Sequence, residues 1–386
     1  MTTPSFSFAP VQLPPNAMRL REEVRQFLAA QEAAGTFAPG PAGWARVDPD
    51  FSRRLGARGW IGMTWPKRYG GHERSALERY VVTEELLVAG APMRGHWAAD
   101  RQLGPLLLEF GTEEQKQRFL PEIAAGRCMV AIGLSEPDSG SDLAAIRTKA
   151  VKAAGGWRVD GRKIWISLAH RSQLMSLFVR TSPKSEDRHA GVSRFLVDMA
   201  AKGITIRPIV NMTGEHDFNE VVFDDLFVPD NMVVGEVGGA WQQISKDLAY
   251  ERSAPDRWLQ SHDLLLRTIE RIGRAPDRAQ SEVLGRLVAH LWTLQSMSLS
   301  IAGMLENGQN PSVEASIVKD LGTHYDQEIP QWARTLVPEH MRALMPLEDG
   351  FEQSLRYNLL FSPAVTIKGG TTEILRNTIA RALGLR

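Results

Sequence analysis

The sequence predicts an α+β fold in which an N-terminal helical domain and a C-terminal helical bundle flank a central β domain. Apolar residues recur at helical spacing before residue 127 and again after residue 239. Between these regions they alternate, in short segments separated by turn residues. Because no helix is expected between the short strands, they favour an antiparallel sheet or small barrel over a Rossmann unit. We therefore expect three domains, at residues 1–126, 127–236 and 237–386.

The N-terminal domain is predicted from two apolar stripes and one helix start. The stripes have residues on one helical face, namely Leu20, Val24, Phe27 and Leu28 in the first and Leu77, Tyr80, Val81 and Val88 in the second. Thr112, which precedes Glu113 and Glu114, predicts the N-terminal cap of a further helix. These residues indicate a domain made of helices.

The β domain is predicted from alternating segments. Residues 157–159 and 164–166 flank Asp160 and Gly161, a pair that favours a two-residue hairpin turn. Further strands are expected at 176–180, 193–198, 204–210 and 220–228.

The C-terminal domain is predicted to begin with a helix at Gly239. Residues 262–325 are expected to form long helices. Pro330, Pro338 and Pro346 predict a break, with a less regular connection over 340–363. The last helix is expected to start at a cap formed by Thr371 or Thr372, and Gly384 is expected to end it.

The composition excludes several classes of protein. Among the 386 residues, Lys plus Arg and Asp plus Glu each number 45, and this balance gives no sign of a nucleic-acid surface. The single cysteine, Cys128, excludes an internal disulfide and a cysteine-based metal site, so we expect a reducing compartment and no metal. No secretory signal or bilayer-length apolar segment is present, and we expect a cytoplasmic protein without a membrane span.

Residues 133–142, Gly-Leu-Ser-Glu-Pro-Asp-Ser-Gly-Ser-Asp, form a polar segment between two apolar ones. This composition predicts a rigid loop that offers hydroxyl and backbone N–H groups to a ligand. An ordinary polar surface loop is an equally good interpretation of the composition alone.

A second candidate loop, at residues 367–373, directly precedes the last helix. Gly369 and Gly370 allow backbone N–H groups at a helix start to approach an anion such as a phosphate or pyrophosphate. A plain helix cap is an equally good interpretation.

Glu251 is an unusual residue on the predicted helix after the β domain. It shares one face with Trp241, Ile244 and Leu248. Apolar surroundings raise the proton affinity of a carboxylate, which would suit a general base. An ion pair with an arginine such as Arg252 would lower that affinity again, so both interpretations stay open.

Four segments in this order resemble the acyl-CoA dehydrogenase family. They are residues 133–142, Lys-Ile-Trp-Ile-Ser at 163–167, Leu-Ala-Tyr-Glu-Arg at 248–252, and Gly-Gly-Thr-Thr-Glu-Ile-Leu-Arg-Asn at 369–377. The resemblance extends from about residue 20 to the end of the chain.

The resemblance implies a flavoenzyme that binds FAD and oxidises an acyl-CoA thioester to the 2,3-enoyl-CoA. It implies that Ser135 and Ser167 hydrogen-bond the isoalloxazine edge and that Trp165 packs against the ring. Ser141 would contact the pantetheine or pyrophosphate of the acyl carrier. The loop of Gly370, Thr371 and Glu373 would face the adenosine half of FAD, and an electron-transfer flavoprotein would accept the electrons.

The sequence departs from many family members at the base. Many family members carry a glutamate directly before the Gly-Thr of the last loop, but this chain has Gly369 at that position. Many also carry an aromatic residue one position earlier, where this chain has Lys368. A minority carry the base in a Glu-Arg pair after the β domain, which Glu251 and Arg252 match. The resemblance thus implies Glu251 as base, Arg252 as a substrate contact, and the Gly369 N–H as a donor to the thioester oxygen. Lys368 would attract negative charge or point to water.

Family members carry sequence motifs that contact the adenine of the FAD bound to a neighbouring subunit. This chain has no counterpart of those motifs at residues 271–295 or 327–366. The pattern resembles bacterial degradative enzymes, some built from two related chains and acting on bulky thioesters, including steroid side chains. We therefore expect a homodimer, a homotetramer or a heterotetramer with a related chain. Two hypotheses remain: an active dehydrogenase, and a non-catalytic chain that completes a partner's FAD site. A third hypothesis is an acyl-CoA oxidase, but such enzymes resemble longer chains than this one.

Overall fold

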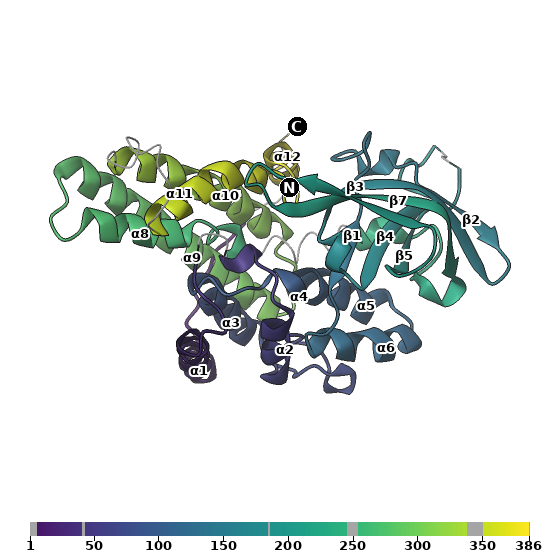
Figure 1. Ribbon diagram of the computed structural model, residues 1–386, viewed down its shortest axis with the longest axis horizontal. Helices are drawn as coiled ribbons and strands as arrows, with labels where there is room; N and C mark the ends of the chain where they lie inside the picture. Colours follow the sequence, from purple (N-terminus) through teal and green to yellow (C-terminus); the bar gives the residue numbers. More distant parts are fainter. Residues whose placement is uncertain (1–5, 41–42, 184–185, 245–253, 338–349, 386) are drawn as a thin grey trace. The chain divides into compact units, whose positions relative to one another are not determined.

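A computed structural model describes residues 6–40, 43–183, 186–244, 254–337 and 350–385 of the chain (Figure 1). The chain forms two compact units. Unit 1 contains residues 1–47, 74–93 and 249–386, and unit 2 contains residues 48–73 and 94–248. The domain boundaries expected from the sequence stay predictions.

The N-terminal part of unit 1 is held together by the first predicted apolar stripe and by Leu77, Tyr80 and Val81 of the second. The expectation for Val88 is wrong, because this last residue of its helix is exposed. Helix α1 (Pro15–Ala33) buries the first stripe, and helix α3 (Ala76–Val88) begins at a capping box between Ser75 and Glu78. Ala17 of α1 and Tyr80 of α3 share a core cluster with Ala302, which lies on helix α9 (Arg278–Glu306). The two N-terminal helices therefore pack on a helix from the other end of the sequence.

The remainder of unit 1 is a bundle of helices around α10 (Ser312–Leu336). Figure 1 shows α8 (His262–Ile272), α9, α10 and α11 (Gly350–Phe361) side by side. Helix α12 (Thr372–Ala382) also packs on α10. As predicted, Thr371 caps α12, and Gly384, at φ 72°, follows its end.

Two sequence expectations for this bundle are wrong. Pro330 does not break α10, because the carbonyl of Asp326, which the missing proline N–H leaves without its helical donor, accepts the Ser261 hydroxyl at 2.9 Å. Residues 350–361, part of the expected irregular connection, form α11 because Phe351 and Leu355 bury one face of a helix that packs on α8.

Unit 2 begins with short helices. Helix α2 (Pro49–Ala57) is capped by Asp48, and α4 (Arg94–Ala98) runs through a π-helical turn, η3 (Ala99–Leu103), into α5 (Gly104–Phe110). Helix α6 (Glu113–Ala124) starts at the predicted cap, where the Thr112 hydroxyl accepts from the Gln115 backbone N–H. Helix α4 contacts the first strand of the sheet.

In the described residues of unit 2, the sheet has eight strands, and the four later segments predicted from the sequence are confirmed as strands. They are β1 (Val130–Gly133), β2 (Lys149–Ala153), β3 (Gly156–Ser167), β4 (Leu174–Arg180), β5 (Val192–Asp198), β6 (Ile204–Val210), β7 (His216–Pro229) and β8 (Val233–Val234). Their order is β6-β7-β3-β2-β4-β5-β8, and β1 pairs with β4. Most pairs are antiparallel as predicted, but β1 and β2 pair with β4 in parallel.

The hairpin turn predicted at Asp160 and Gly161 is wrong. Both residues lie inside the continuous strand β3, which pairs with the long strand β7 on either side of them. The ladder shifts register between Val159 and Gly161, because β7 has one residue more than β3 between the flanking pairs, so the bulge lies in β7, opposite Asp160. Gly161 has φ 146°, and a Cβ there would lie 2.7 Å from Thr148. The turn that joins β2 to β3 instead contains Gly155, at φ 73°.

Beyond the sheet, the predicted helix after Gly239 is described only at its start. Residues 240–244 are helical, and Ala240 and Ile244 pack in a cluster with Ile146, Phe178 and Val192 of the β domain. Leu248, Glu251 and Arg252 lie outside the described residues. None of the helices in the described parts of the chain combines the length and hydropathy needed to span a bilayer.

Candidate functional site

The most unusual backbone feature of unit 2 is a bulge at residues 163–166, which we call the Trp165 bulge. Lys163 pairs with Val221 and Ile166 with Asn219, so β3 has one residue more than β7 between these pairs. Trp165 has φ 62°, a conformation that costs a bulky residue roughly 1–2 kcal/mol.

The Trp165 side chain is 58% exposed, although tryptophan is usually mostly buried. Its ring meets that of Phe218 edge to face, with 6.1 Å between the centroids. An aromatic ring that is presented to solvent on strained backbone is typical of a ligand-binding position.

The polar segment at residues 133–142, which we call the Ser135 loop, lies against this bulge. The Ile164 N–H donates to the Ser135 carbonyl at 2.9 Å. The Lys163 ammonium donates to the Leu134 carbonyl at 2.9 Å and to Glu136 Oε1 at 2.8 Å. Sequence segments about 30 residues apart therefore form one surface.

Two hydroxyl groups on this surface can donate to a ligand. Ser135 and Ser167 are both half-buried, and within the described part of the chain neither hydroxyl makes a hydrogen bond. Together with Trp165 they provide an aromatic face and two polar edges. These are the three residues that the family resemblance assigns to one ring system.

The base of the Ser135 loop is closed by hydrogen bonds within the loop. Glu136 and Ser139 exchange two backbone hydrogen bonds of 2.8 and 3.0 Å, and the Ser139 hydroxyl donates to the Asp142 carbonyl at 2.6 Å. Ser141 and Asp142 at the tip are exposed. The base of the loop is thus fixed by hydrogen bonds, and its tip is accessible to a ligand.

The charges beneath the loop are matched. Burial acts to raise the pKa of Glu136, but the Lys163 charge and hydrogen bonds from Lys163, Thr148 and the Arg147 N–H outweigh it, so the pKa lies below its ordinary value. Burial lowers the pKa of Lys163 to about 8, although Glu136 opposes this. Glu136 also accepts from the Arg147 and Thr148 N–H groups at 2.6 and 2.9 Å.

Three further residues surround the tip of the Ser135 loop. Arg188 forms an ion pair with Asp142, and the His189 ring stacks on Trp241 with 4.1 Å between centroids. Sequence patterns did not identify Arg188 or His189, because only the pairing of β4 with β5 brings their connection to this loop. An exposed cation and aromatic pair beside Ser141 suits an anionic ligand with a planar group.

Unit 1 contains the second candidate loop. Gly369 and Gly370 have φ values of 70° and 104°, which explains why the sequence has glycine at both positions. Thr371 accepts from the Ile374 N–H at 3.4 Å, and the Glu373 pKa is lowered by hydrogen bonds from its own N–H and the Thr371 side chain. Thr371 and Glu373 therefore act as a plain helix cap. This cap is compatible with an anion bound at the backbone of the two glycines.

Lys368 points into unit 1 and not into water. Its ammonium lies 4.5 Å from the ring centroid of Trp44, 4.3 Å from that of Phe361, and 3.3 Å from Gln260 Oε1. Gln260 donates in turn to the Asp256 carbonyl at 2.8 Å. These contacts anchor the last loop to the segment before α8.

Deeper in unit 1, the helix α10 carries a buried acid. Burial raises the pKa of Asp326 to about 7, against hydrogen bonds from the Ser261 and Gln260 N–H groups and the charges of Lys368 and Lys319. The carboxylate accepts from the Ser261 N–H at 3.0 Å. Asp326 therefore supports the start of α8.

The predicted site residues fall into three sets. Ser135, Ser141, Trp165 and Ser167 lie on one surface of unit 2, and Gly369, Gly370, Thr371 and Glu373 lie on one loop of unit 1. Glu251 and Arg252 are outside the described residues. Among the residues that the structure describes, no three His, Cys, Asp or Glu side chains gather in a way that could hold a metal ion.

The order of helical, β and helical domains defines a protein with the acyl-CoA dehydrogenase fold. Models of the N-terminal, middle and C-terminal domains of acyl-CoA dehydrogenase match residues 14–127, 131–226 and 265–384. The chain belongs to the acyl-CoA dehydrogenase family.

Relatives in this family include mycobacterial dehydrogenases. The chain is 35% identical to acyl-CoA dehydrogenase IpdE1 of Mycolicibacterium smegmatis, over 95% of this chain and 97% of that protein. It is 36% identical to FadE34 of Mycobacterium tuberculosis, over 86% of this chain but only 45% of that protein's length. A solved structure, the Tcur3481-Tcur3483 steroid ACAD, matches with a TM-score of 0.83 and 27% identity, over 97% of this chain and 99% of that one.

Proposed function

We propose that the chain is a catalytically active, FAD-dependent dehydrogenase that converts an acyl-CoA thioester to its 2,3-enoyl-CoA. The observation that carries this proposal is the strained and exposed Trp165 between the hydroxyls of Ser135 and Ser167. Membership of a family of FAD-dependent enzymes supports it.

The residues of unit 2 fit an isoalloxazine ring. Trp165 offers an aromatic face, and Ser135 and Ser167 offer donors to a ring that gains negative charge on reduction. A bound FAD would supply the hydride acceptor. Hydrogen bonds within the Ser135 loop hold Ser135, and the bond from the Ile164 N–H to the Ser135 carbonyl joins the loop to β3, which carries Ser167.

Glu251 is the proposed general base, which takes the α-proton of the thioester. No carboxylate at position 369 competes for this role, since Gly369 has no side chain. The Gly369 N–H is proposed to donate to the thioester oxygen, which makes the α-proton more acidic. Arg252 is proposed to contact the substrate.

The remaining residues are proposed to bind the ends of the two ligands. Ser141 would hydrogen-bond the pantetheine or pyrophosphate of coenzyme A, beside Arg188 and His189. Gly370, Thr371 and Glu373 would face the adenosine half of FAD. We also propose an electron-transfer flavoprotein as acceptor and a cytoplasmic location, in line with a single cysteine.

A second candidate function is that of a non-catalytic chain that completes a partner's FAD site. Two observations favour it: the adenine-binding motifs are absent from this sequence, and the similar Tcur3481-Tcur3483 steroid ACAD carries two protein names. That likeness also favours a bulky acyl group, such as a steroid side chain, over a short linear one.

One experiment separates the two functions. The chain is purified alone, its flavin absorption is recorded, and straight-chain and steroid side-chain acyl-CoAs are added without oxygen. Bleaching of the flavin by one of them supports the active dehydrogenase. The partner role is supported if the purified chain is colourless, acquires FAD only with a related chain, and does not need its own Glu251 for the flavin of that complex to bleach. Oxygen consumption during turnover would instead indicate an oxidase.

A further inference from the structure

A second residue near the Trp165 bulge also has left-handed backbone. Leu168 has φ 55°, three residues after Trp165 at φ 62°. The two positions enclose Ile166 and Ser167 at the end of β3. Non-glycine residues keep such conformations only when their surroundings fix them, so specific contacts must hold this strand end.

Asn219 of β7 makes the central contact. It is fully buried, and its side-chain Nδ2 donates to the Ile166 carbonyl at 2.9 Å. A bulge interrupts the ladder, so the side-chain amide here provides a donor for a strand carbonyl at the bulge. Because the Ile166 carbonyl can only accept, the amide nitrogen must face it, and Oδ1 must face the other way.

His216 fixes this orientation of the amide. Its Nε2 lies 2.7 Å from Asn219 Oδ1, and since that oxygen only accepts, Nε2 carries the proton. The His216 ring stacks on His170, with 3.9 Å between centroids and an interplanar angle of 18°. His170 belongs to the turn that follows Leu168, so the stack joins that turn to the start of β7.

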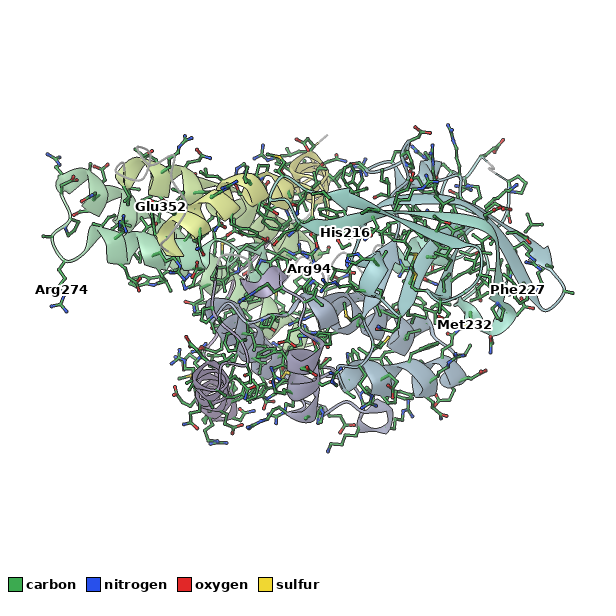
Figure 2. All side chains as sticks on the ribbon, in the orientation of Figure 1. Arg94, His216, Phe227, Met232, Arg274 and Glu352 are labelled. Atoms are coloured by element: carbon green, nitrogen blue, oxygen red, sulfur yellow. The ribbon has the colours of Figure 1, made fainter. Side chains whose placement is uncertain are left out.

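An ion pair holds the same region from the helical side. The Leu168 N–H donates to the Asp217 carbonyl at 2.9 Å, and Asp217 Oδ2 accepts from Arg94 Nη2 of α4 at 2.9 Å. Arg94 and Asp217 are each 9% exposed. Figure 2 shows Arg94 and His216, the chain neighbour of Asp217, in the same part of unit 2. Both sides of the strand end are therefore fixed by buried polar contacts.

We propose that Asn219 is a positioning residue for the flavin: through its hydrogen bonds to Ile166 and His216, it fixes the strand end that presents Trp165 and Ser167. This inference rests on the proposed function, in which these two side chains contact the ring. Asn219 itself is fully buried, so we propose that it acts through Ile166 and His216 and not by contact with the ring. No sequence motif pointed to it, because its partners lie on other strands and turns.

Three substitutions test this role. N219D keeps an acceptor for His216 but removes the donor to Ile166, and N219A removes both without adding a charge. H216F keeps a ring to stack on His170 but removes the donor to Asn219. The control is N211D, because Asn211 Oδ1 only accepts, from the Thr213 and Glu215 N–H groups, and a carboxylate preserves this.

The first measurement is FAD binding to the full chain, with the visible spectrum of the bound flavin. N219D and N219A should raise the dissociation constant about tenfold and shift the flavin absorption bands, and H216F should raise it roughly two- to threefold. N211D should leave both unchanged. A destabilised fold alone would lower the amount of bound flavin without shifting its bands, which separates positioning from a merely structural role.

The second measurement does not need flavin. The chain is labelled with fluorotryptophan, and the fluorine resonance of Trp165 is assigned by its absence in W165F. N219A should move or broaden this resonance, and N211D should not. If the wild-type chain binds no FAD, the proposed function fails, while a moved resonance still supports the positioning role. An unmoved resonance, or unchanged FAD affinity and spectrum in folded N219A and N219D, overturns it.

Discussion

The ammonium group of Lys163 lies 2.8 Å from the Glu136 carboxylate, and both side chains are buried. Lys163 belongs to the Trp165 bulge and Glu136 to the Ser135 loop, and the same ammonium also donates to the Leu134 carbonyl. A buried ion pair, together with two hydrogen bonds to carbonyls of the Ser135 loop, thus joins the two segments that we propose to contact the flavin. Its loss should affect stability and cofactor binding together.

We expect E136Q to lower the free energy of unfolding by about 3–5 kcal/mol at pH 7, because it leaves the Lys163 charge buried without a counter-charge. The pKa of Glu136 lies below its ordinary 4.5, so its contribution is present above pH 4.5 and is lost as the pH falls through the lowered pKa. The difference between E136Q and wild type in urea unfolding should therefore shrink on acidification.

The matched control is E122Q, at an ion pair between Glu122 and Arg127 in which both side chains are about half exposed. It should cost less than about 1 kcal/mol. Equal effects of E136Q and E122Q at pH 7 would show that the buried pair does not hold the loop.

Trp165 should matter for flavin binding and little for stability. W165A should weaken FAD binding about two- to tenfold, because it removes an aromatic contact worth about 0.5–1.5 kcal/mol. W165G should be more stable than W165A by about 1 kcal/mol, since glycine tolerates φ 62°. Flavin titration and urea unfolding measure the two effects. W292F, at another exposed tryptophan, should change neither, and normal FAD affinity in W165A would remove Trp165 from the site.

The buried Asp326 should make stability depend on pH in the opposite sense to Glu136. Burial raises its pKa from 3.8 to about 7, so the folded state holds the proton where the unfolded state has lost it. The stability gained by protonation is present below pH 3.8 and lost as the pH rises to about 7. Relative to wild type, D326N should gain on the order of a few kcal/mol between pH 4 and pH 7. Urea unfolding midpoints at both pH values test this, and a constant difference would contradict it.

Ser141 should act on substrate binding and not on the chemical step. S141A should raise the Michaelis constant roughly three- to tenfold, the value of one hydrogen bond of about 1 kcal/mol, and leave kcat unchanged. Steady-state kinetics with one acyl-CoA give both constants. S182A, at another exposed serine of unit 2, is the control, and an unchanged Michaelis constant in S141A would exclude the contact with coenzyme A.

Local patterns predicted the elements of the fold well, and they failed where a distant partner decides. Asp160 and Gly161 have the composition of a hairpin turn, but β7 pairs with β3 on both sides of them and forms a bulge opposite Asp160. Pro330 reads as a helix breaker, but Ser261, 69 residues earlier, satisfies the Asp326 carbonyl. Neither contact can be predicted from the sequence near the residue that it affects.

The candidate site follows the same rule. The roles predicted for Ser135, Trp165 and Ser167 come from segments that resemble those of a known family, and the structure joins these segments through Lys163. Asn219, His216 and Arg188 were missed, because polar residues in a strand or loop carry no signal of function until pairing brings them to the site. Lys368 was noticed but not explained, since its aromatic neighbours are Trp44 and Phe361.

We propose that Glu251 takes the α-proton of an acyl-CoA thioester bound by this chain. The most direct measurement is flavin absorption after anaerobic mixing of the FAD-loaded chain with an acyl-CoA that bleaches the wild type. E251Q should bind the same amount of FAD and the same thioester, but bleach about 10²–10⁴-fold more slowly, since it lacks the proton acceptor. Bleaching of E251Q at the wild-type rate would contradict the account.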